Sequence, residues 1–422
     1  MPPRASIASM DQRIDILGLS FADLEGKVAT LLPGGRGLAG KVYARAFEYG
    51  RLDLEGLGLS ERNRRSWEEH FRVGLLGAGR RESEEGDFGP TEKAVLILED
   101  GAEIECVLIP MPVRQKSGSS RRAEGRPRST LCVSSQAGCS MGCAFCETGR
   151  GGLRRNLRAA EIVSQLITTR TLFGWDPANI VYMGMGEPLD NIEGLLGSLA
   201  VLTDARGSAF SWERLTVCTC GKAEGLAALR EAAGTRLNLS LSLNAGDDAT
   251  RNRIMPINRS TDLGCLTAAL RDWPRRRNFV LALNWCLLPG INDRPEDARE
   301  AAAFARSVGR TVFNLIPYNP GRKPIAPAPT EEEIDRFEAL LVGEGCLVKR
   351  RARKGGRIMA ACGQLGGPGA AGVASGTAMA EGETARVAGA ANETAVAAGA
   401  ASGAAGATDA AGPLTGTEIG NL

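Results

Sequence analysis

The sequence has little of several residue types on which common protein functions depend. It contains a single histidine, His70, in 422 residues, and aromatic residues make up 5% of the chain. Histidine is a usual ligand of zinc, so its scarcity argues against zinc sites built on histidine. The sequence also lacks an apolar run long enough to span a bilayer and an apolar signal segment after Met1. We therefore expect a soluble, cytoplasmic protein with no membrane segment.

The sequence also has no large excess of charge of one sign. It has 51 Lys and Arg against 49 Asp and Glu, a net charge of +2, which excludes a simple polycation. The charge is uneven, however, with basic runs at Arg114–Arg128, Arg150–Arg158, Arg275–Arg277 and Lys349–Arg357. A solvated loop explains any one of these runs, whereas several runs near one site would suit a phosphate backbone.

Cysteine, in contrast, is frequent, with eleven residues in no regular pairing pattern, which favours a reducing compartment over a disulfide framework. Cys139, Cys143 and Cys146 follow a C-x3-C-x2-C spacing with glycines before and between them. A [4Fe-4S] cluster takes four ligands, so three thiolates leave one iron open to bind a small molecule and pass it an electron. That open iron is the basis of radical S-adenosylmethionine (SAM) chemistry.

Two simpler interpretations of these cysteines remain. They could form a structural zinc knuckle, or they could be buried thiols that only pack in the core. A zinc site usually needs a fourth Cys or His within reach, and His70 is the one histidine that the chain offers. The cluster interpretation is therefore favoured.

The chain divides into a barrel-sized core with additions at both ends. Residues 1–88 are predicted to be a small helical accessory domain, with helices at 41–49 and 60–71, which either caps the core or binds RNA. Residues 89–129 are predicted to hold two strands, 94–98 and 103–109, followed by the exposed basic loop 114–128.

Residues 130–365 alternate between strand and helix patterns, which favours a parallel sheet or barrel. Six such units predict an α/β fold with a partial (β/α)6 barrel of the TIM type. The predicted strands are 130–134, 180–184, 215–219, 238–243, 279–286 and 311–317. The predicted helices are 157–171, 192–202, 225–233, 261–273, 294–307 and 330–342.

The unusual motifs fall directly after predicted strands. The three cysteines follow the first strand, Gly184–Pro188 follow the second, Asn244 the fourth and Asn319 the sixth. In β/α barrels the active site is built at this end of the strands. Residues 366–422 are dominated by Ala, Gly, Thr and Ser, and we expect a disordered tail because this composition cannot offset the entropy of ordering.

Four segments complete the pattern: Leu131–Gln136, Gly149–Gly152 leading to Arg155–Leu157, Met183–Pro188 and Ala360–Leu365. Together they closely resemble the RlmN/Cfr family of radical SAM RNA methyltransferases, over roughly residues 41–365. The cysteine motif alone would indicate only the radical SAM superfamily. The settings of Cys132 and Cys362 are specific to this branch.

This resemblance implies a role for each matched residue. Cys362 would accept a methyl group from one SAM, a radical from a second SAM would activate that methyl group for addition to adenine, and Cys132 would release the product through a transient disulfide. Glu105 would accept the proton of the adenine ring, although an exposed strand residue is its simpler interpretation. The implied SAM contacts are Gly186, Glu187, Cys218, Ser242, Leu243, Asn244 and Asn319.

The resemblance also implies ribosomal or transfer RNA as substrate, an electron donor such as flavodoxin or ferredoxin, and a monomer. Methylation of adenine C2 is favoured over C8 because it is commoner in the family. Cys218 stands where a serine is common, Asn244 where histidine is common, and Arg357 and Met359 replace residues that are often acidic or small. Two alternatives stay open: a radical SAM enzyme with a peptide or small-molecule substrate, and a non-catalytic RNA-binding protein with a structural metal.

Overall fold

The computed structural model describes residues 11–32, 35–112, 128–234, 236–274, 276–277 and 279–366. Nearly all of the predicted basic loop at 114–128 and all but the first residue of the predicted tail at 366–422 lie outside these ranges. Among the described helices, none combines the length and the hydropathy that a membrane crossing requires.

A ten-stranded sheet forms the centre of the described chain, in the order β14-β13-β12-β11-β10-β9-β6-β5-β4-β3. Its strands from β6 to β14 all pair in parallel, which confirms the predicted partial barrel. The short edge strand β14 adds one strand to the six expected. These strands are β6 (Arg128–Cys132), β9 (Asn179–Tyr182), β10 (Leu215–Thr219), β11 (Asn238–Ser242), β12 (Leu281–Leu287), β13 (Thr311–Pro317) and β14 (Val348–Arg350).

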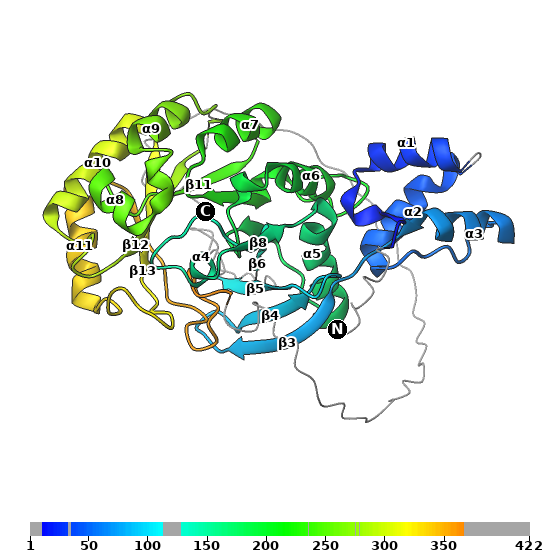
Figure 1. The fold of residues 1–422 in the computed structure, drawn as a ribbon, viewed down its shortest axis with the longest axis horizontal. Coiled ribbons are helices and arrows are strands. Elements are labelled where there is room, and N and C mark those ends of the chain that lie inside the picture. Colours follow the sequence, from blue (N-terminus) through cyan, green and yellow to red (C-terminus); the bar gives the residue numbers. More distant parts are fainter. Residues whose placement is uncertain are drawn as a thin grey trace, which may run out of the picture. The chain divides into compact units, whose positions relative to one another are not determined.

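Helices connect successive parallel strands and lie along the outside of the curved sheet (Figure 1). Trp285 on β12 shows why they pack there, since its buried ring stacks on Phe337 of the last helix with 5.5 Å between ring centroids. Burial of one large apolar side chain contributes roughly 1.5–3 kcal/mol. The helices are α5 (Ala159–Phe173), α6 (Ile192–Leu202), α7 (Ala223–Ala233), α8 (Asp248–Ile254), α9 (Leu263–Arg271), α10 (Pro295–Val308) and α11 (Glu331–Gly343).

Three antiparallel strands extend the sheet beyond β6. They are β3 (Gly77–Glu84), β4 (Thr91–Ile97) and β5 (Glu103–Met111). The pair β4 and β5 matches the two predicted strands, but β3 lies in the region that the sequence predicts to be helical. Most residues of β3 are exposed, so this edge strand lacks the alternation of apolar and polar residues by which a strand is recognised.

The N-terminal region holds three helices, α1 (Phe21–Leu31), α2 (Arg36–Tyr49) and α3 (Glu61–His70). The sequence predicts the last two, whereas α1 was missed. Its buried Leu24 and Val28 lie four residues apart, and it packs against α2. The short 3-10 helix η1 (Ile16–Gly18) packs its buried Ile16 and Leu17 toward α5 and so joins this region to the barrel.

Candidate functional site

The cysteine loop, residues 139–146, is closed at its base by a small antiparallel pair, β7 (Gln136–Gly138) and β8 (Leu153–Asn156). The Cys139 N–H donates to the Gly152 carbonyl at 2.9 Å. Gly138 has φ +84°, and a Cβ at this position would lie 2.0 Å from the Gly152 oxygen. The loop therefore needs glycine at residue 138, because any side chain would open the pair that holds the cysteines.

The three cysteines share one cavity of about 150 Å³, which is open to solvent, at the carboxyl ends of the parallel strands. Of the four motifs placed after separate strands, those of the cysteines, of Gly184–Pro188 and of Asn244 line this cavity, whereas Asn319 does not. The predicted site residues that line the cavity are Cys139, Cys143, Cys146, Gly186, Glu187, Cys218, Ser242, Asn244 and Cys362. Four others, Glu105, Cys132, Leu243 and Asn319, lie outside this lining.

Cys362 reaches the cavity because the C-terminal segment, residues 353–366, returns across the end of the barrel. The Gly363 carbonyl accepts a 2.7 Å hydrogen bond from the Glu147 N–H, directly after the cysteine loop. The hydroxyl of Thr148, on α4 (Glu147–Gly151), donates to the Leu365 carbonyl at 2.7 Å. Two bonds thus tie the residues after Cys362 to the helix that follows the cysteine loop.

The antiparallel extension anchors the same segment from its other side. The Gly366 N–H donates to the Glu105 carboxylate on β5 at 2.9 Å, and the Arg357 N–H donates to the Glu84 carboxylate on β3 at 2.7 Å. The ammonium group of Lys354 donates to the Pro110 carbonyl. The strands β3 to β5 therefore position the segment that carries Cys362.

Met183 lies between the two cysteines to which the resemblance gives a role. The Cys362 thiol contacts the Met183 sulfur at 3.6 Å, and the Met183 backbone N–H donates to the thiol of Cys132, at the end of β6. Burial raises the pKa of Cys132 well above its ordinary value. The cavity walls also raise the pKa of Cys362, while the positive charge of Arg351 opposes this effect. Cys362 nonetheless has solvent access, because the cavity is open.

Glu105 is buried on β5, with 3% of its surface exposed, so the interpretation of an exposed strand residue is wrong. Its carboxylate lies 3.6 Å from the ammonium group of Lys93 on β4. Lys93 is 2% exposed and also lies 3.0 Å from the Glu82 carboxylate. Sequence analysis did not single out Lys93, although a lysine directly before the apolar run 94–98 was a signal that a buried partner exists.

The part of the cavity wall that directly follows β9 requires a glycine and holds a buried carboxylate. Gly186 has φ +100°, and a Cβ there would lie 2.5 Å from the Gln136 Cβ. The Glu187 carboxylate accepts hydrogen bonds from the Leu189 N–H, the Thr219 hydroxyl and the Cys220 N–H. Burial raises the pKa of Glu187 above its ordinary value, whereas these hydrogen bonds act to lower that pKa. The Cys220 thiol is also hydrogen-bonded to this carboxylate, so the amino group of a ligand would have to displace that weak donor.

Asn244 lines the cavity with φ +57°, a conformation in which Asn and His are enriched among residues other than glycine. Its side-chain oxygen accepts the Cys286 N–H at 2.8 Å, which fixes the amide in the wall. The backbone requirement explains why asparagine can stand at a position where the resemblance leads us to expect histidine.

Cys218 replaces an expected serine but keeps a polar contact. Its sulfur accepts a 3.1 Å hydrogen bond from the Asn284 amide and lies 3.6 Å from the Ser242 hydroxyl. Burial raises its pKa to about 12, so the group remains a neutral thiol at physiological pH. Of the other predicted contacts, Leu243 is fully buried and Asn319 is half-buried, with its amide donating to the Pro317 carbonyl.

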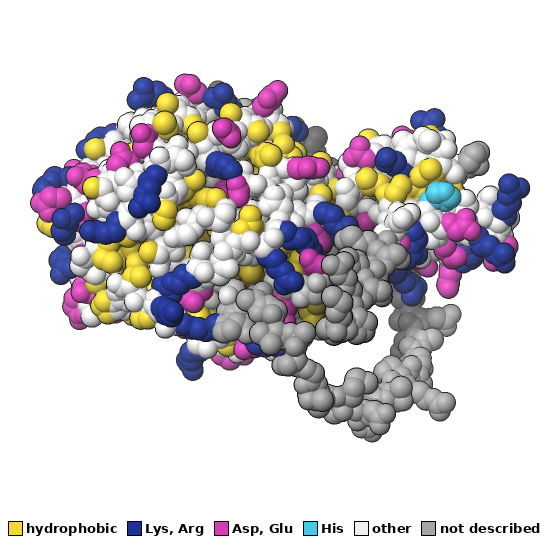
Figure 2. Space-filling model, in the orientation of Figure 1, with side chains coloured by type: hydrophobic (Ala, Val, Ile, Leu, Met, Phe, Trp, Pro, Cys, Tyr) yellow, Lys and Arg dark blue, Asp and Glu magenta, His cyan; other side chains and the backbone are white. Residues whose placement is uncertain are grey.

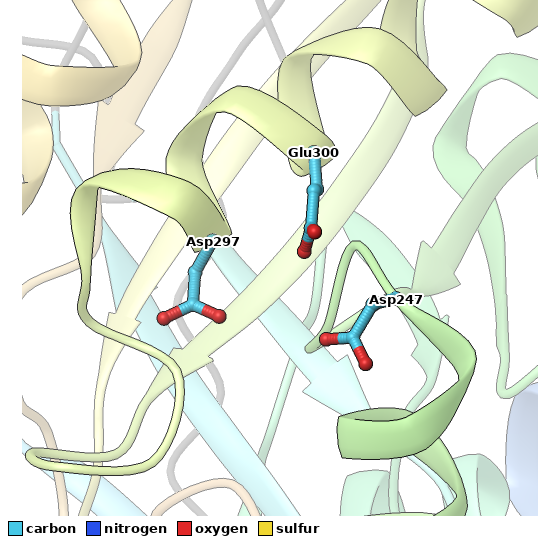
Figure 3. A group of neighbouring side chains, drawn as sticks. All are labelled: Asp247, Asp297 and Glu300. Atoms are coloured by element: carbon cyan, nitrogen blue, oxygen red, sulfur yellow. The ribbon is translucent and has the colours of Figure 1, made fainter.

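A second group of potential metal ligands lies on the outside of the barrel (Figure 3). Asp247, Asp297 and Glu300 place carboxylate oxygens within 4.8 Å of one another. Asp247 caps α8 by accepting the Thr250 N–H, and Asp297 pairs with Arg294 at the start of α10. Helix capping and this ion pair account for two of the three carboxylates.

Lys and Arg side chains are interspersed with Asp and Glu over the visible face of the molecule (Figure 2). Three arginines of the run Arg150–Arg158 are engaged by carboxylates. Arg150 lies 2.5 Å from Glu147, and Arg155 lies 2.7 Å from Asp100 and 2.9 Å from Glu161. Arg158 lies 3.1 Å from Glu99. Ion pairs within the protein therefore use part of the charge that the sequence suggested for a phosphate backbone.

Comparisons with known proteins agree with this geometry. The model of the radical SAM superfamily matches residues 133–315. "Dual-specificity RNA methyltransferase RlmN" from Geotalea uraniireducens is 35% identical over 362 residues, which cover 84% of this chain and 97% of the relative. "Probable dual-specificity RNA methyltransferase RlmN 1" from Protochlamydia amoebophila is 39% identical over 278 residues, which cover 66% of this chain and 74% of the relative. The crystal structure of a radical SAM methyltransferase from Sphaerobacter thermophilus is similar with a TM-score of 0.70 and 32% identity, covering 83% of this chain and 99% of that one.

Proposed function

We propose that this chain, which belongs to the RlmN family of radical SAM RNA methyltransferases, methylates an adenine ring carbon of RNA with Cys362 as the methyl carrier. The observation that carries the proposal is that one cavity holds Cys362 and the three cysteines of the loop, although 216 residues separate Cys146 from Cys362 in the chain. C2 is proposed ahead of C8, and ribosomal or transfer RNA is the proposed substrate.

The residues present fit a [4Fe-4S] cluster and SAM. Three thiols from one loop match the ligands of a cluster with one open iron, and the Gly186–Glu187 wall offers close backbone approach and a carboxylate for the amino group of SAM. When bound, the cluster and SAM supply the 5'-deoxyadenosyl radical that a methyl group needs in order to react with an adenine carbon. A donor such as flavodoxin or ferredoxin would supply the electron.

Cys362 acts first, as a nucleophile. Its sulfur forms a bond to the methyl group of SAM and S-adenosylhomocysteine leaves with the electron pair of the broken bond. Only the thiolate is reactive, and the charge of Arg351 favours that form against the effect of the cavity walls on the pKa. Solvent access through the open cavity gives adenine a path to the methylated sulfur.

Cys132 acts last. After the methyl carbon has bonded to adenine, and the adduct has given its ring proton to Glu105 and its unpaired electron back to the cofactor, the Cys132 thiolate would attack the Cys362 sulfur. A disulfide would form as the bond between that sulfur and the carbon breaks. The electron pair stays with the carbon, which takes a proton and becomes the methyl group of the product. An external thiol then reduces the disulfide. Met183 contacts both thiols, Cys362 through its side-chain sulfur and Cys132 through its backbone N–H, so the two cysteines share a neighbour.

Glu105 is proposed as the group that takes the proton from the adenine ring. It already accepts the Gly366 N–H, so it lies beside the segment that carries Cys362. The Lys93 ammonium group lies 3.6 Å from this carboxylate and holds it in the interior.

The test is to reconstitute the chain anaerobically with iron and sulfide, add SAM, RNA and dithionite, and measure 5'-deoxyadenosine and methylated adenosine. We expect both products from the native chain and no methylated adenosine from Cys362→Ala. Cys265→Ala is the matched control, since this exposed thiol on α9 lies outside the cavity lining. Full methylation by Cys362→Ala would rule out Cys362 as the methyl carrier. An unchanged cellular content of 2-methyladenosine and 8-methyladenosine after gene deletion would rule out RNA adenine as the substrate.

A further inference from the structure

A guanidinium group is fully buried behind the wall of the cavity. Arg251, on α8, has 0% exposure. It donates to the carbonyl oxygens of Cys220, Ser242 and Leu243 at 2.7, 3.3 and 3.1 Å, and to the side-chain oxygen of Asn258 at 2.7 Å. All four acceptors are neutral, so these hydrogen bonds satisfy its donors without balancing its charge.

No carboxylate of the described chain forms a salt bridge with Arg251 within 4.0 Å. Asp248 affects its charge only weakly, and the Asp248 carboxylate is itself occupied by the Asn258 amide and the Leu263 N–H. A buried cation without a counter-charge costs several kcal/mol. A buried arginine at this position is therefore expected only if an anion balances its charge during function.

The ionisable groups on which the charge of Arg251 acts include two cysteines of the cavity wall. Its charge acts on Cys143 of the cysteine loop and on Cys220, which lines the same cavity. The helix that carries Arg251 also holds the loop, because the Ala144 N–H donates to the Ile254 carbonyl at 2.9 Å. Met255, the next residue, lines the cavity. Arg251 therefore lies directly behind the place where three thiolates would gather around iron.

We propose that Arg251 is the counter-charge of the iron-sulfur cluster and raises the cluster's reduction potential. The inference rests on the cofactor part of the proposed function. Three thiolates give the bound cluster a net negative charge, and one electron from the donor increases that charge by one. A fixed cation nearby stabilises the reduced form more than the oxidised form. The same side chain fixes the ends of β10 and β11, so Arg251 is a positioning residue as well.

The measurement is a redox titration of the reconstituted full chain, without RNA, followed by electron paramagnetic resonance of the reduced cluster. Arg251→Gln should shift the midpoint to a more negative potential by at least a tenfold change in the one-electron equilibrium, about 59 mV. Arg251→Lys should recover most of the native potential. Arg206→Gln is the control, because this exposed arginine packs on the Phe21 ring, and its removal should leave the potential unchanged.

A double variant covers the case in which Arg251→Gln does not fold. Asn258→Asp with Asp248→Asn moves one carboxylate against the guanidinium and keeps the hydrogen bond between residues 248 and 258. It should give the same negative shift with full iron content. An unchanged potential in the folded, iron-loaded variants would overturn the counter-charge. If the native chain takes up no cluster, the proposed cofactor fails instead, so the two failures are distinguishable.

Discussion

The cysteine loop and the C-terminal segment both bring sulfur to one cavity, but they are held there in different ways. The loop is closed by local contacts, such as Cys139 to Gly152 and Cys146 to Cys143. The segment is held by bonds to residues more than 200 positions away, including Thr148 and Glu105. A sequence pattern can encode the first arrangement within twenty residues, whereas the second exists only once the barrel and its extension have folded.

The difference also separates two kinds of chemistry. The loop is proposed to hold the cofactor that generates a radical, and the segment is proposed to bring the carbon on which that radical acts. Although the segment is bonded to the helix after the loop, the loop is closed by contacts of its own, so the segment can be disabled while the loop stays in place. Four predictions test this separation.

The largest effects should come from the cysteines themselves. Cys143→Ala should abolish iron binding, 5'-deoxyadenosine formation and RNA methylation together, because it removes a proposed cluster ligand. Cys362→Ala should bind iron and still form 5'-deoxyadenosine, yet should lose methylation by at least 10³-fold, a typical cost of removing a nucleophile. Iron analysis and product chromatography distinguish the two patterns.

Loss of iron from Cys362→Ala would contradict the separate roles of the cysteine loop and the C-terminal segment. That result would make residue 362 a ligand or a structural support of the cluster.

The sequence predicted the parts of the site that depend on local pattern. The spacing of Cys139, Cys143 and Cys146 and the strand ends before Gly186 and Asn244 all converge as expected. Strand and helix positions in the barrel could be read because buried strands are apolar throughout and helices are amphipathic. The roles of Cys132 and Cys362 came from resemblance alone, since nothing in the spacing of these two residues indicates that they share a neighbour.

The sequence could not show the contacts that depend on tertiary structure. The edge strand β3 is mostly exposed and charged, so neither its conformation nor its role as an anchor for residue 357 is visible in the pattern. The burial of Lys93 and Glu105 follows only from the stacking of β4 and β5 against the segment. The full burial of Arg251 likewise depends on residues from different elements: Cys220 after β10, Ser242 at the end of β11 and Asn258 in the 3-10 helix η4 (Pro256–Arg259).

A smaller effect should follow from Lys93→Met, which leaves two carboxylates without their buried cation. We expect a loss of about 3–5 kcal/mol in the free energy of unfolding, measured by denaturant titration. The matched control is Arg299→Met, whose ion pair with Glu296 is exposed and should cost about 1 kcal/mol or less. Equal losses of unfolding free energy in the two variants would show that the buried ion pairs of Lys93 do not support the C-terminal segment.

Thr148→Val should act on the segment more than on the loop. The change preserves the shape of the side chain and removes the 2.7 Å hydrogen bond to the buried Leu365 carbonyl. Leaving that carbonyl unpaired costs about 1–3 kcal/mol, so methylation should fall roughly tenfold while iron content stays constant. If Thr148→Val instead lost iron but kept normal methylation per bound cluster, the hydrogen bond would support the cysteine loop and not the C-terminal segment.

The smallest effect concerns the turn that supports β8. A hydrogen bond from Arg155 lowers the pKa of Asp100 from 3.8 to about 2. A lowered carboxyl pKa stabilises the fold above the unfolded value, and this stabilisation is lost as the pH falls from 3.8 through about 2. Asp100→Asn should therefore reduce stability by about 1 kcal/mol or less at pH 7.

The difference between Asp100→Asn and the native chain should shrink as the pH approaches 2, in urea titrations at each pH. A difference that grows on acidification would mean that the ion pair does not stabilise the turn.

The methylation state of Cys362 tests the central claim most directly. The reconstituted chain would be incubated with SAM carrying a deuterated methyl group, digested, and analysed by mass spectrometry before and after RNA is added. The account predicts a deuterated methyl group on the peptide that contains Cys362, and its transfer to adenine in a single turnover. Labelled RNA produced while Cys362 remains an unmodified thiol throughout would contradict it.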